Sequence, residues 1–407
     1  MFVLKHLYLI ITMQLVERHI IKKSNPLHKE LDYMSFLSKN LYNQALYRAR
    51  QEFFETGKYL NYSNLVKQLT QENQVDYTAL PRKVSQWVLK QVDNNFVSFF
   101  KSLKSEKVSH KVRIPKYLKK NGRNLLTFTN QAISTKELKQ GYLKLSGCNN
   151  KLKVLHTNIQ QVRVVPQNGV YVVEIIYNQQ EPELLTNNNY VGVDIGLNNL
   201  ATVGGNNIKP VIINGKPLKS INQYYNKKLS KLKSRQDKCK NKKVNSKKIN
   251  ILTRKRNNKV KDYLHKASRM LVNHLVSNNV SKVVVGHNKE WKQDINIGKQ
   301  NNQNFVQIPF NQFIQMLEYK ARLKGIEVIT REESYTSKCS FLDNETIEKH
   351  DTYLGKRVKR GLFKSNNGRL INADLNGALN ILRKEIPNAF DGYGIEVCST
   401  PTVLTVK

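Results

Sequence analysis

The hydrophobic pattern changes its period twice along the chain. Residues 15–22 are typical of a strand, and from Pro26 apolar residues recur at three- and four-residue spacing, which predicts a helix. A second stretch with helical spacing covers residues 84–100. From residue 112 to residue 177 the period becomes that of strands. The first half therefore predicts a helical module inserted into a β domain.

A turn signal inside the β-rich region fixes how two of its strands pair. Gln167-Asn168-Gly169 lies between the β-rich runs 162–165 and 170–177, and Asn-Gly in that position is a strong hairpin signal. With the N-terminal strand, this hairpin predicts a small β-barrel or sandwich. Residues 179–189 are polar, contain a proline, and are the expected linker to the next domain.

The second half alternates strands and helices. A probable hairpin at residues 210–213 precedes a continuously apolar run at 282–286, which is typical of a buried parallel strand. A helix is expected over 310–323 and another strand over 326–330. An antiparallel hairpin followed by alternating helix and strand fits the ribonuclease-H-like fold, so the expected fold class is α/β.

Two short segments at the ends of this half each contain an aspartate. Asp194 follows a run of β-formers and is flanked by Gly192 and Gly196, which leave room for a backbone or a phosphate. Asp374 lies where a helix with an apolar face begins. Carboxylates from two separate elements can converge on divalent metal and promote displacement at a phosphodiester. The pair predicts a metal-dependent nuclease.

Each aspartate also has a simpler interpretation. Asp194 can be an ordinary acid at a strand end, and a similar pattern opens sugar-kinase and actin-like ATPase folds. Asp374 by itself is more often a helix N-cap. The nuclease hypothesis depends on finding both segments, in this order, on a strongly basic chain.

The net charge supports a polyanionic partner. The 407 residues have a formal net charge of +38, which favours binding of nucleic acid with release of its counterions. Four widely spaced cysteines, Cys148, Cys239, Cys339 and Cys398, argue against a disulfide framework and for a reducing compartment. The apolar N-terminus is too short for a membrane span. We expect no membrane association and a cytoplasmic, nucleoid-associated location.

The charge is concentrated between residues 226 and 262, where acids are almost absent. Such a block repels itself unless a polyanion neutralises it, which favours nucleic-acid contact over a merely solvated helical face. A second basic cluster lies near residue 358. The candidate nucleic-acid-binding residues are Lys227, Lys228, Lys242, Lys243, Lys247, Lys248, Arg254, Arg256, Lys356, Arg357 and Arg360.

The order of these motifs resembles a known family. The chain resembles TnpB, the RNA-guided nuclease of insertion sequences related to type V CRISPR effectors. The resemblance lies in three segments that follow one another in the family's order: Gly192-Val-Asp194-Ile-Gly196-Leu, Tyr335-Thr-Ser-Lys-Cys339 and Asp374-Leu-Asn376-Gly-Ala378-Leu-Asn380-Ile. The N-terminal segments Leu37-Ser-Lys-Asn-Leu-Tyr-Asn43 and Ile114-Pro115-Lys116 are also similar. The resemblance extends from Met13 to about residue 384.

The resemblance implies a function and a set of domains. TnpB proteins bind a guide RNA from their own element, recognise a short motif beside a double-stranded DNA target, and cut with a RuvC-like domain. The implied parts are an N-terminal extension at 1–12, a β-barrel at 13–26 and 108–186, a helical recognition domain at 27–107, a RuvC-like domain at 187–384 with a basic stretch at 221–270 and a degenerate zinc-ribbon-like insert at 335–370, and a tail at 385–407. We expect a monomer bound to its RNA.

One acid of the family pattern is missing. The usual glutamate follows the second buried strand, but here that strand ends Val285-Gly286-His287-Asn288. An acid at the end of the neighbouring strand can reach the same pocket, because adjacent strands lie about 4.8 Å apart. Glu333 is the preferred candidate, as in a branch of the family with a relocated glutamate. Glu332, Glu290 and the absence of a third functional acid are the alternatives.

The family's zinc ligands are also reduced. Many relatives carry two Cys-x-x-Cys pairs in the insert, whereas here Cys339 stands alone. Asp343, His350 and Asp351 are candidates to complete an irregular site around Cys339, but the spacing is not that of a zinc ribbon. Zinc is therefore not expected, although Cys339 and His350 are candidates for a weak site.

The leading hypothesis is an RNA-guided endonuclease that uses two Mg²⁺ ions. Asp194 is expected to bridge both ions, with Asp374 and Glu333 each binding one, and water is the expected nucleophile. The rival is an RNA-guided DNA-binding repressor that has lost cleavage. The missing middle glutamate favours the rival, and the retained aspartates disfavour it. An unguided RNA-binding protein of ribosomal type is a third hypothesis.

Overall fold

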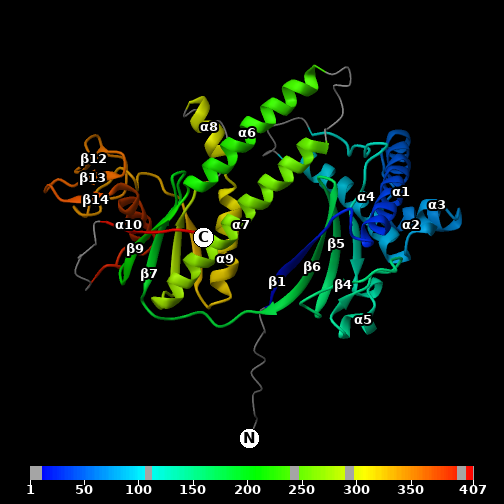
Figure 1. Cartoon of the computed structure of the whole chain (residues 1–407), viewed down its shortest axis with the longest axis horizontal. Helices are drawn as coiled ribbons and strands as arrows, with labels where there is room; N and C mark the ends of the chain where they lie inside the picture. Colours follow the sequence, from blue (N-terminus) through cyan, green and yellow to red (C-terminus); the bar gives the residue numbers. More distant parts are fainter. Residues whose placement is uncertain (1–11, 106–111, 239–246, 289–297, 392–399, 407) are drawn as a thin grey trace, which may run out of the picture. The chain divides into compact units, whose positions relative to one another are not determined.

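The protein divides into two compact units, residues Met1–Gln180 and Glu181–Lys407. The structure is a computed structural model and describes residues 12–105, 112–238, 247–288, 298–391 and 400–406 (Figure 1). Residues 1–11 of the expected N-terminal extension, together with Glu290, Lys242 and Lys243, lie outside these ranges, whereas Thr12 begins the first strand. Helices and strands both contribute to each unit, so the mixed α/β class is confirmed.

The first unit is a twisted antiparallel sheet covered by helices. Its strands pair in the order β1-β6-β5-β2, and β3 and β4 form a separate two-stranded ribbon. The elements are β1 (Thr12–Ile21), α1 (Leu27–Thr56), α2 (Tyr62–Gln71), α3 (Val75–Ala79), α4 (Arg82–Leu103), β2 (Leu126–Thr129), η1 (Asn130–Ala132), α5 (Thr135–Lys139), β3 (Tyr142–Leu143), β4 (Leu152–Lys153), β5 (Ile159–Gln167) and β6 (Val170–Gln180).

The predicted hairpin is present, and its turn has the expected geometry. Asn168 and Gly169 join β5 to β6 with φ values of 48° and 79°. Positive φ at both central residues is what a type I′ turn requires, and its twist matches the twist of the strands. Between β1 and β2 the helices α1 to α4 are inserted, as the change of period predicted.

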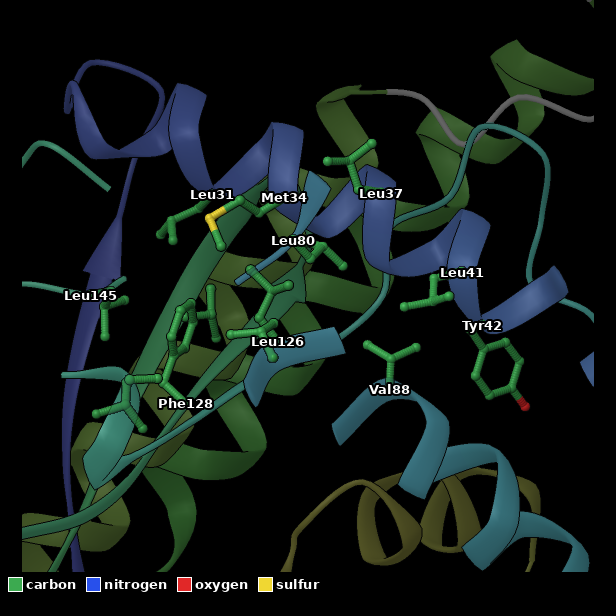
Figure 2. Close-up of a cluster of buried hydrophobic side chains, with 14 of the residues drawn as sticks. Leu31, Met34, Leu37, Leu41, Tyr42, Leu80, Val88, Leu126, Phe128 and Leu145 are labelled. Atoms are coloured by element: carbon green, nitrogen blue, oxygen red, sulfur yellow. The ribbon is translucent and has the colours of Figure 1, made fainter. Parts of the chain in front are cut away.

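A single hydrophobic core joins these helices to the sheet. Leu31, Met34 and Leu37 of α1 belong to the same cluster of buried side chains as Leu126 and Phe128 of β2, part of which is drawn in Figure 2. Strand spacing was expected from residue 112, but 112–125 form neither helix nor strand, and short helices interrupt the region after residue 129. Pro115 and the polar run that follows it lack the alternation that a strand needs. The described strands form an open sheet, and the barrel remains a prediction.

The second unit contains a six-stranded mixed sheet in the order β11-β10-β7-β8-β9-β15. Strands β7, β8 and β9 are antiparallel, β10 is parallel to β7, and β11 is parallel to β10. The strands and their helices are β7 (Tyr190–Asp194), β8 (Asn199–Gly205), β9 (Ile208–Asn214), α6 (Lys216–Asp237), α7 (Lys247–Ser277), β10 (Lys282–Gly286), α8 (Lys299–Val306), α9 (Phe310–Arg322) and β11 (Glu327–Arg331).

The rest of the unit forms an insert, a helix and an edge strand. A three-stranded sheet of β12 (Lys356–Lys359), β13 (Leu362–Lys364) and β14 (Leu370–Asn372) precedes α10 (Ala373–Glu385). Strand β15 (Thr402–Leu404) then pairs in parallel with β9. The sequence predicted only a tail after residue 385, because three residues carry too little pattern to indicate a strand whose partner lies almost 200 positions earlier.

Both faces of this sheet are buried. On β10, Val283 and Val285 pack with α7 and α9 on one face, while Val284 packs with Ile381 and Leu382 of α10 on the other. A strand covered on both faces needs a continuous apolar run, which is why residues 282–286 lack alternation. No helix in the described part of the chain is long and apolar enough to cross a membrane.

Glycine allows α10 to approach the central strand very closely. A Cβ added at Gly192 of β7 would lie 1.9 Å from the carbonyl oxygen of Ala378 in α10. Gly204 of β8 faces the same helix, and its Cβ would lie 2.5 Å from Leu375. The small residues of this face therefore set the distance between the helix that carries Asp374 and the strand that carries Asp194.

We predict that Gly192→Ala destabilises the second unit. The added methyl group meets a backbone carbonyl, so α10 must move away from the sheet, at a cost of about 1–3 kcal/mol. Urea unfolding followed by circular dichroism should show an earlier midpoint for the variant. An unchanged midpoint would show that α10 does not depend on this close contact.

Candidate active site

Asp194 lies at the carboxyl end of β7, on the face that packs against α10. Side chains alternate along the strand, so Val191 and Val193 enter the core while Gly192 and Asp194 face the helix. The carboxylate lies close to α10, since a Cβ at Gly377 would be 3.1 Å from Asp194 Oδ2. The absence of a side chain at Gly377 leaves room for the Asp194 carboxylate, which explains why the segment that contains Asp374 has a glycine at this position.

Asp374 lies in the first turn of α10, but it is not the N-cap. The cap is Asn372, whose Oδ1 accepts hydrogen bonds from the backbone N–H of Asp374 at 3.0 Å and of Leu375 at 3.1 Å. The Asp374 carboxylate therefore points elsewhere. Asn199 Nδ2 donates to its Oδ2 at 2.7 Å, and Arg357 pairs with its Oδ1 at 3.0 Å. The simpler N-cap interpretation of Asp374 is wrong.

Glu333 follows β11 and its carboxylate reaches the end of β10. A Cβ at Gly286 would lie 2.8 Å from Glu333 Oε2, so the carboxylate occupies the space beside the last residue of β10. Glu332, in contrast, is exposed and accepts a hydrogen bond from Ser334 Oγ. Of the three candidates for the third acid, Glu333 points into the interior, Glu332 does not, and Glu290 lies outside the described residues.

The charges of two neighbouring carboxylates act on Asp194. Burial, then the charges of Asp374 and Glu333, raise the pKa of Asp194 to about 8, while Arg357 opposes the shift. Burial also raises the pKa of Glu333. Within the described residues no group donates a hydrogen bond to the Asp194 carboxylate. A half-buried carboxylate without donors, close to other acids, is stabilised in its charged form by a bound cation.

This set of donors fits a hard divalent cation such as Mg²⁺, which prefers carboxylate oxygens. The acids do not already surround one point, however: no group of three His, Cys, Asp or Glu side chains in the described ranges is arranged to hold an ion. Arg357 instead neutralises part of the negative charge through its ion pair with Asp374. Binding of a metal would require this guanidinium to release Oδ1.

A cavity of about 500 Å³, here called the acid cavity, opens beside the two aspartates. Acids form part of its wall and cations form another part, an arrangement that can accept both metal and phosphate. Its lining residues are Asp194, Gly196, Leu197, Asn198, Asn199, Thr202, Lys216, Arg357, Arg360, Gly361 and Asp374. Lys216 was not predicted, because only the return of the β8–β9 hairpin brings it to Asp194.

The other basic candidates occupy several surroundings. Lys227 and Lys228 are exposed on α6, and Lys247 and Lys248 are exposed at the start of α7. Arg254 is half-buried. Lys356 and Arg360, like Arg357, are exposed in and beside β12 of the insert. Lys242 and Lys243 fall outside the described ranges.

Arg256 differs from these residues because its guanidinium is engaged within the protein. It donates to Asn222 Oδ1 at 2.8 Å, to Asn257 Oδ1 at 3.0 Å and to the carbonyl of Gln307 at 2.7 Å. Desolvation by burial lowers its pKa. These contacts hold α6, α7 and the end of α8 together, and the sequence offered no signal that would separate this arginine from its neighbours.

The two zinc candidates have partners of other kinds. Cys339 is buried, and its Sγ donates to the carbonyl of Glu348 at 3.6 Å. His350 Nε2 lies 2.8 Å from the carbonyl of Thr346. Neither belongs to a group of three potential ligands among the described residues.

Comparison with known proteins identifies relatives along most of the chain. The family model OrfB_IS605, described as "Probable transposase", matches residues 171–292, and the model "Cas12f1-like, TNB domain" matches residues 310–381. A TnpB-like protein, ORF457 of Acidianus two-tailed virus, is 23% identical over 403 residues, which cover 88% of this chain and 84% of the relative. The chain is therefore similar to TnpB-like proteins along most of its length.

The chain is also similar to proteins of the CRISPR-associated Cas12f group. The CRISPR-associated endodeoxyribonuclease Cas12f2 of Micrarchaeota archaeon (strain CG1_02_47_40) is 30% identical over 250 residues, 56% of this chain and 43% of the relative. A Cas12f1-sgRNA-target DNA complex covers 91% of this chain and 100% of its own, with a TM-score of 0.39 and 17% identity. A CRISPR-Cas12f ternary complex covers 91% and 82%, with a TM-score of 0.37 and 14% identity.

The raised pKa of Asp194 predicts a pH-dependent stability. The pKa of Asp194 is about 8 in the folded chain and has its ordinary value of 3.8 in the unfolded chain. Between these values the folded state binds more protons, so the free energy of unfolding should decrease as the pH rises from about 5 to about 8. Glu333 contributes in the same direction. Urea unfolding in EDTA across this range measures the effect.

The Asp194→Asn variant is the control for this prediction. It cannot ionise, so its stability should decrease less with rising pH than that of the wild type. Mg²⁺ should restore stability to the wild type at the alkaline end, because the ion binds the charged carboxylate. Parallel pH profiles for the two proteins would contradict the assignment of a raised pKa to Asp194.

Proposed function

We propose that this protein is an RNA-guided, Mg²⁺-dependent DNA endonuclease encoded by an insertion sequence. The observation that carries the proposal is the position of Glu333, whose carboxylate fills the space beside Gly286 and interacts with the half-buried Asp194. Together with Asp374 it gives the site three carboxylates, although the usual acid of β10 is absent. This placement favours cleavage over the alternative of a nuclease-inactive RNA-guided repressor.

The topology of the second unit supports a ribonuclease-H-like, RuvC-type domain. Three antiparallel strands, β9-β8-β7, continue into the parallel strands β10 and β11 of one sheet. Asp194 ends the central strand β7, and Asp374 begins the helix α10 that covers it. The alternation of hairpin, helix and strand in the sequence supports the same proposal.

The residues of the site have distinct roles in this proposal. Asp194, Asp374 and Glu333 would hold Mg²⁺, which polarises a phosphodiester and lowers the pKa of water. Arg357 and Lys216 line the acid cavity and can neutralise a phosphate there. Arg357 would exchange its ion pair with Asp374 for a phosphate oxygen. Asn199 keeps the Asp374 carboxylate oriented through Oδ2.

Two further features support nucleic-acid partners. The exposed lysines of α6 and α7 belong to a chain of net charge +38, and the Cas12f2 relative is by its name an endodeoxyribonuclease. In the first unit, a cavity of about 380 Å³ offers stacking and hydrogen-bonding groups suited to base edges. Its lining residues are Trp87, Val88, Gln91, Asn94, Asn95, Leu125, Thr127, Gln161 and Arg163. This cavity is a candidate reader of the target-adjacent motif.

To test this function, the protein is purified together with RNA transcribed from its own locus. The complex is then given a library of DNA targets that all match the guide and differ by random bases next to the matching sequence. Cutting next to one short motif, dependent on Mg²⁺ and on the guide, is the expected result. Target binding without cutting at any Mg²⁺ concentration would favour the repressor. A heterogeneous mixture of copurified RNAs would instead favour an unguided RNA-binding protein.

We predict that Asp194→Ala, Asp374→Ala and Glu333→Gln each reduce cutting below detection while guided binding persists. Each change removes a charge that holds Mg²⁺, and none alters the first unit. Glu332→Gln is the matched control, since the neighbouring carboxylate is exposed, and it should cut like the wild type. An active Glu333→Gln enzyme would remove Glu333 from the site, and full activity of either aspartate variant would remove the nuclease proposal.

We also predict that the exposed lysines of α6 contribute to the salt dependence of nucleic-acid binding. Replacing Lys227, Lys228, Lys231 and Lys233 with Gln should flatten the slope of log affinity against log salt by up to about 3–4, because fewer counterions are released. Filter binding between low and moderate salt measures the slope.

A variant with the same loss of charge controls for net charge alone. It replaces Lys22, Lys23, Lys136 and Lys139, which are exposed in the first unit, with Gln. Equal slopes for the two quadruple variants would show that α6 has no special role in binding.

A further inference from the structure

Two asparagines of α10 are fully buried and take no part in the acid cavity. Asn376 and Asn380 lie four residues apart, on one face of the helix, and both have a relative exposure of 0%. Burying an amide is costly unless its groups are hydrogen-bonded, so the partners of these side chains show what they stabilise. All of the partners but one lie in the turn that follows Glu333.

The contacts of the two amides join this turn to α10. Asn376 Oδ1 accepts from the N–H of Phe341 at 2.9 Å, and its Nδ2 donates to the carbonyl of Cys339 at 2.9 Å. Asn380 Nδ2 donates to the carbonyls of Thr336 at 2.9 Å and of Cys339 at 2.8 Å. The remaining partner is Arg383, which donates to Asn380 Oδ1 at 2.9 Å.

Thr336 extends this network to Glu333. The Thr336 hydroxyl donates to the carbonyl of Glu333 at 2.8 Å, and the Thr336 carbonyl accepts from Asn380. The intervening Tyr335 has a φ of 66°, in the left-handed region that non-glycine residues rarely adopt. The turn is therefore held in a sharp conformation by the same helix that carries Asp374.

Asn288 holds Glu333 from the opposite side. It lies two residues beyond the end of β10, and its Oδ1 accepts from the N–H of Glu333 at 3.1 Å. Its Nδ2 donates to Glu333 Oε1 at 3.4 Å, which leaves Oε2 beside Gly286. One amide thus contacts both the backbone and the carboxylate of the glutamate.

We propose that Asn288 and Asn380 are positioning residues that fix the Glu333 carboxylate beside Gly286, at the end of β10. A glutamate that reaches the site from a neighbouring strand has three flexible side-chain torsions. Hydrogen bonds to its backbone fix where the side chain begins, and the hydrogen bond to its carboxylate fixes where it ends. This inference rests on the proposed function, in which Glu333 binds the metal. If the two asparagines hold Glu333 in this way, a glutamate that follows β11 can take the place of an acid at the end of β10.

The test measures metal binding directly on the full chain with its RNA. Mn²⁺ is titrated, and free Mn²⁺ is followed by electron paramagnetic resonance, for the wild type, Asn288→Ala and Asn380→Asp. The Asp variant keeps the shape and the Arg383 contact but loses both donors. The dissociation constant for Mn²⁺ should rise about tenfold or more in each variant, as is typical when partners of metal ligands are removed.

Asn206→Asp provides a matched control. Asn206 Oδ1 accepts from the N–H of Tyr190 at 2.9 Å and its Nδ2 donates to the carbonyl of Asn188 at 2.7 Å, so it makes the same kind of clamp at the other end of β7. It should lose a similar amount of stability in urea and keep wild-type Mn²⁺ affinity. Equal loss of affinity in the control and in the two variants would show general destabilisation and overturn the proposal.

A conservative variant and the Mg²⁺ dependence of cutting add a second readout. Asn288→Ser retains an acceptor for the Glu333 N–H, so its Mn²⁺ affinity should lie between those of the wild type and Asn288→Ala. Excess Mg²⁺ should restore the cutting rate of Asn288→Ala and Asn380→Asp, whereas Glu333→Gln should stay inactive. A lowered maximal rate with an unchanged Mg²⁺ requirement would overturn the positioning role.

The outcomes separate this inference from the proposed function. If Asp194→Ala binds Mn²⁺ as tightly as the wild type, the acids are not the metal site and both proposals fail. If Asp194→Ala loses Mn²⁺ but Asn288→Ala and Asn380→Asp do not, only the positioning role fails. If the wild type binds Mn²⁺ but does not cut, the positioning role can still be tested, because it is measured through the Mn²⁺ affinity of the Asn288 and Asn380 variants.

Discussion

The half-buried Asp194 carboxylate imposes the main physical constraint on the second unit. It lies at the end of a central strand, under α10, with Asp374 and Glu333 nearby and no hydrogen-bond donor among the described residues. Its raised pKa shows that the folded chain alone disfavours the ionised form. A protein retains such an arrangement at a cost in stability, and the cost is offset when a cation binds.

The surrounding elements are built to keep these acids close. Gly192 and Gly377 remove side chains between β7 and α10, so the helix carrying Asp374 can approach the strand carrying Asp194. Asn372 caps the helix and leaves the Asp374 carboxylate available. The motif Asp374-Leu-Asn376-Gly-Ala378-Leu-Asn380 therefore combines one acid, one glycine for close approach and two buried amides that hold a turn. Its residue types follow from packing as much as from chemistry.

Charge compensation links the site to the insert. Arg357 extends from the exposed strand β12 to pair with Asp374, and Arg360 lines the same cavity. Cations that neutralise acids in the isolated chain can neutralise phosphates when nucleic acid is bound. The insert is held by the Phe363 and Phe341 cluster and by the asparagines of α10. A basic insert held in this way can therefore remain ordered and place an arginine in the acid cavity.

Local patterns were sufficient for the elements whose order is set by nearby residues. The Asn168-Gly169 hairpin, the apolar run of β10 and the helix α10 were predicted correctly, because turn chemistry and hydrophobic period act over a few positions. The two aspartates were identifiable for the same reason. Tertiary structure alone decided that Glu333 points inward and Glu332 outward, that Arg256 is engaged within the protein, and that β15 joins β9. These features depend on the register of strands and the depth of packing between segments far apart in the chain, which no local pattern encodes.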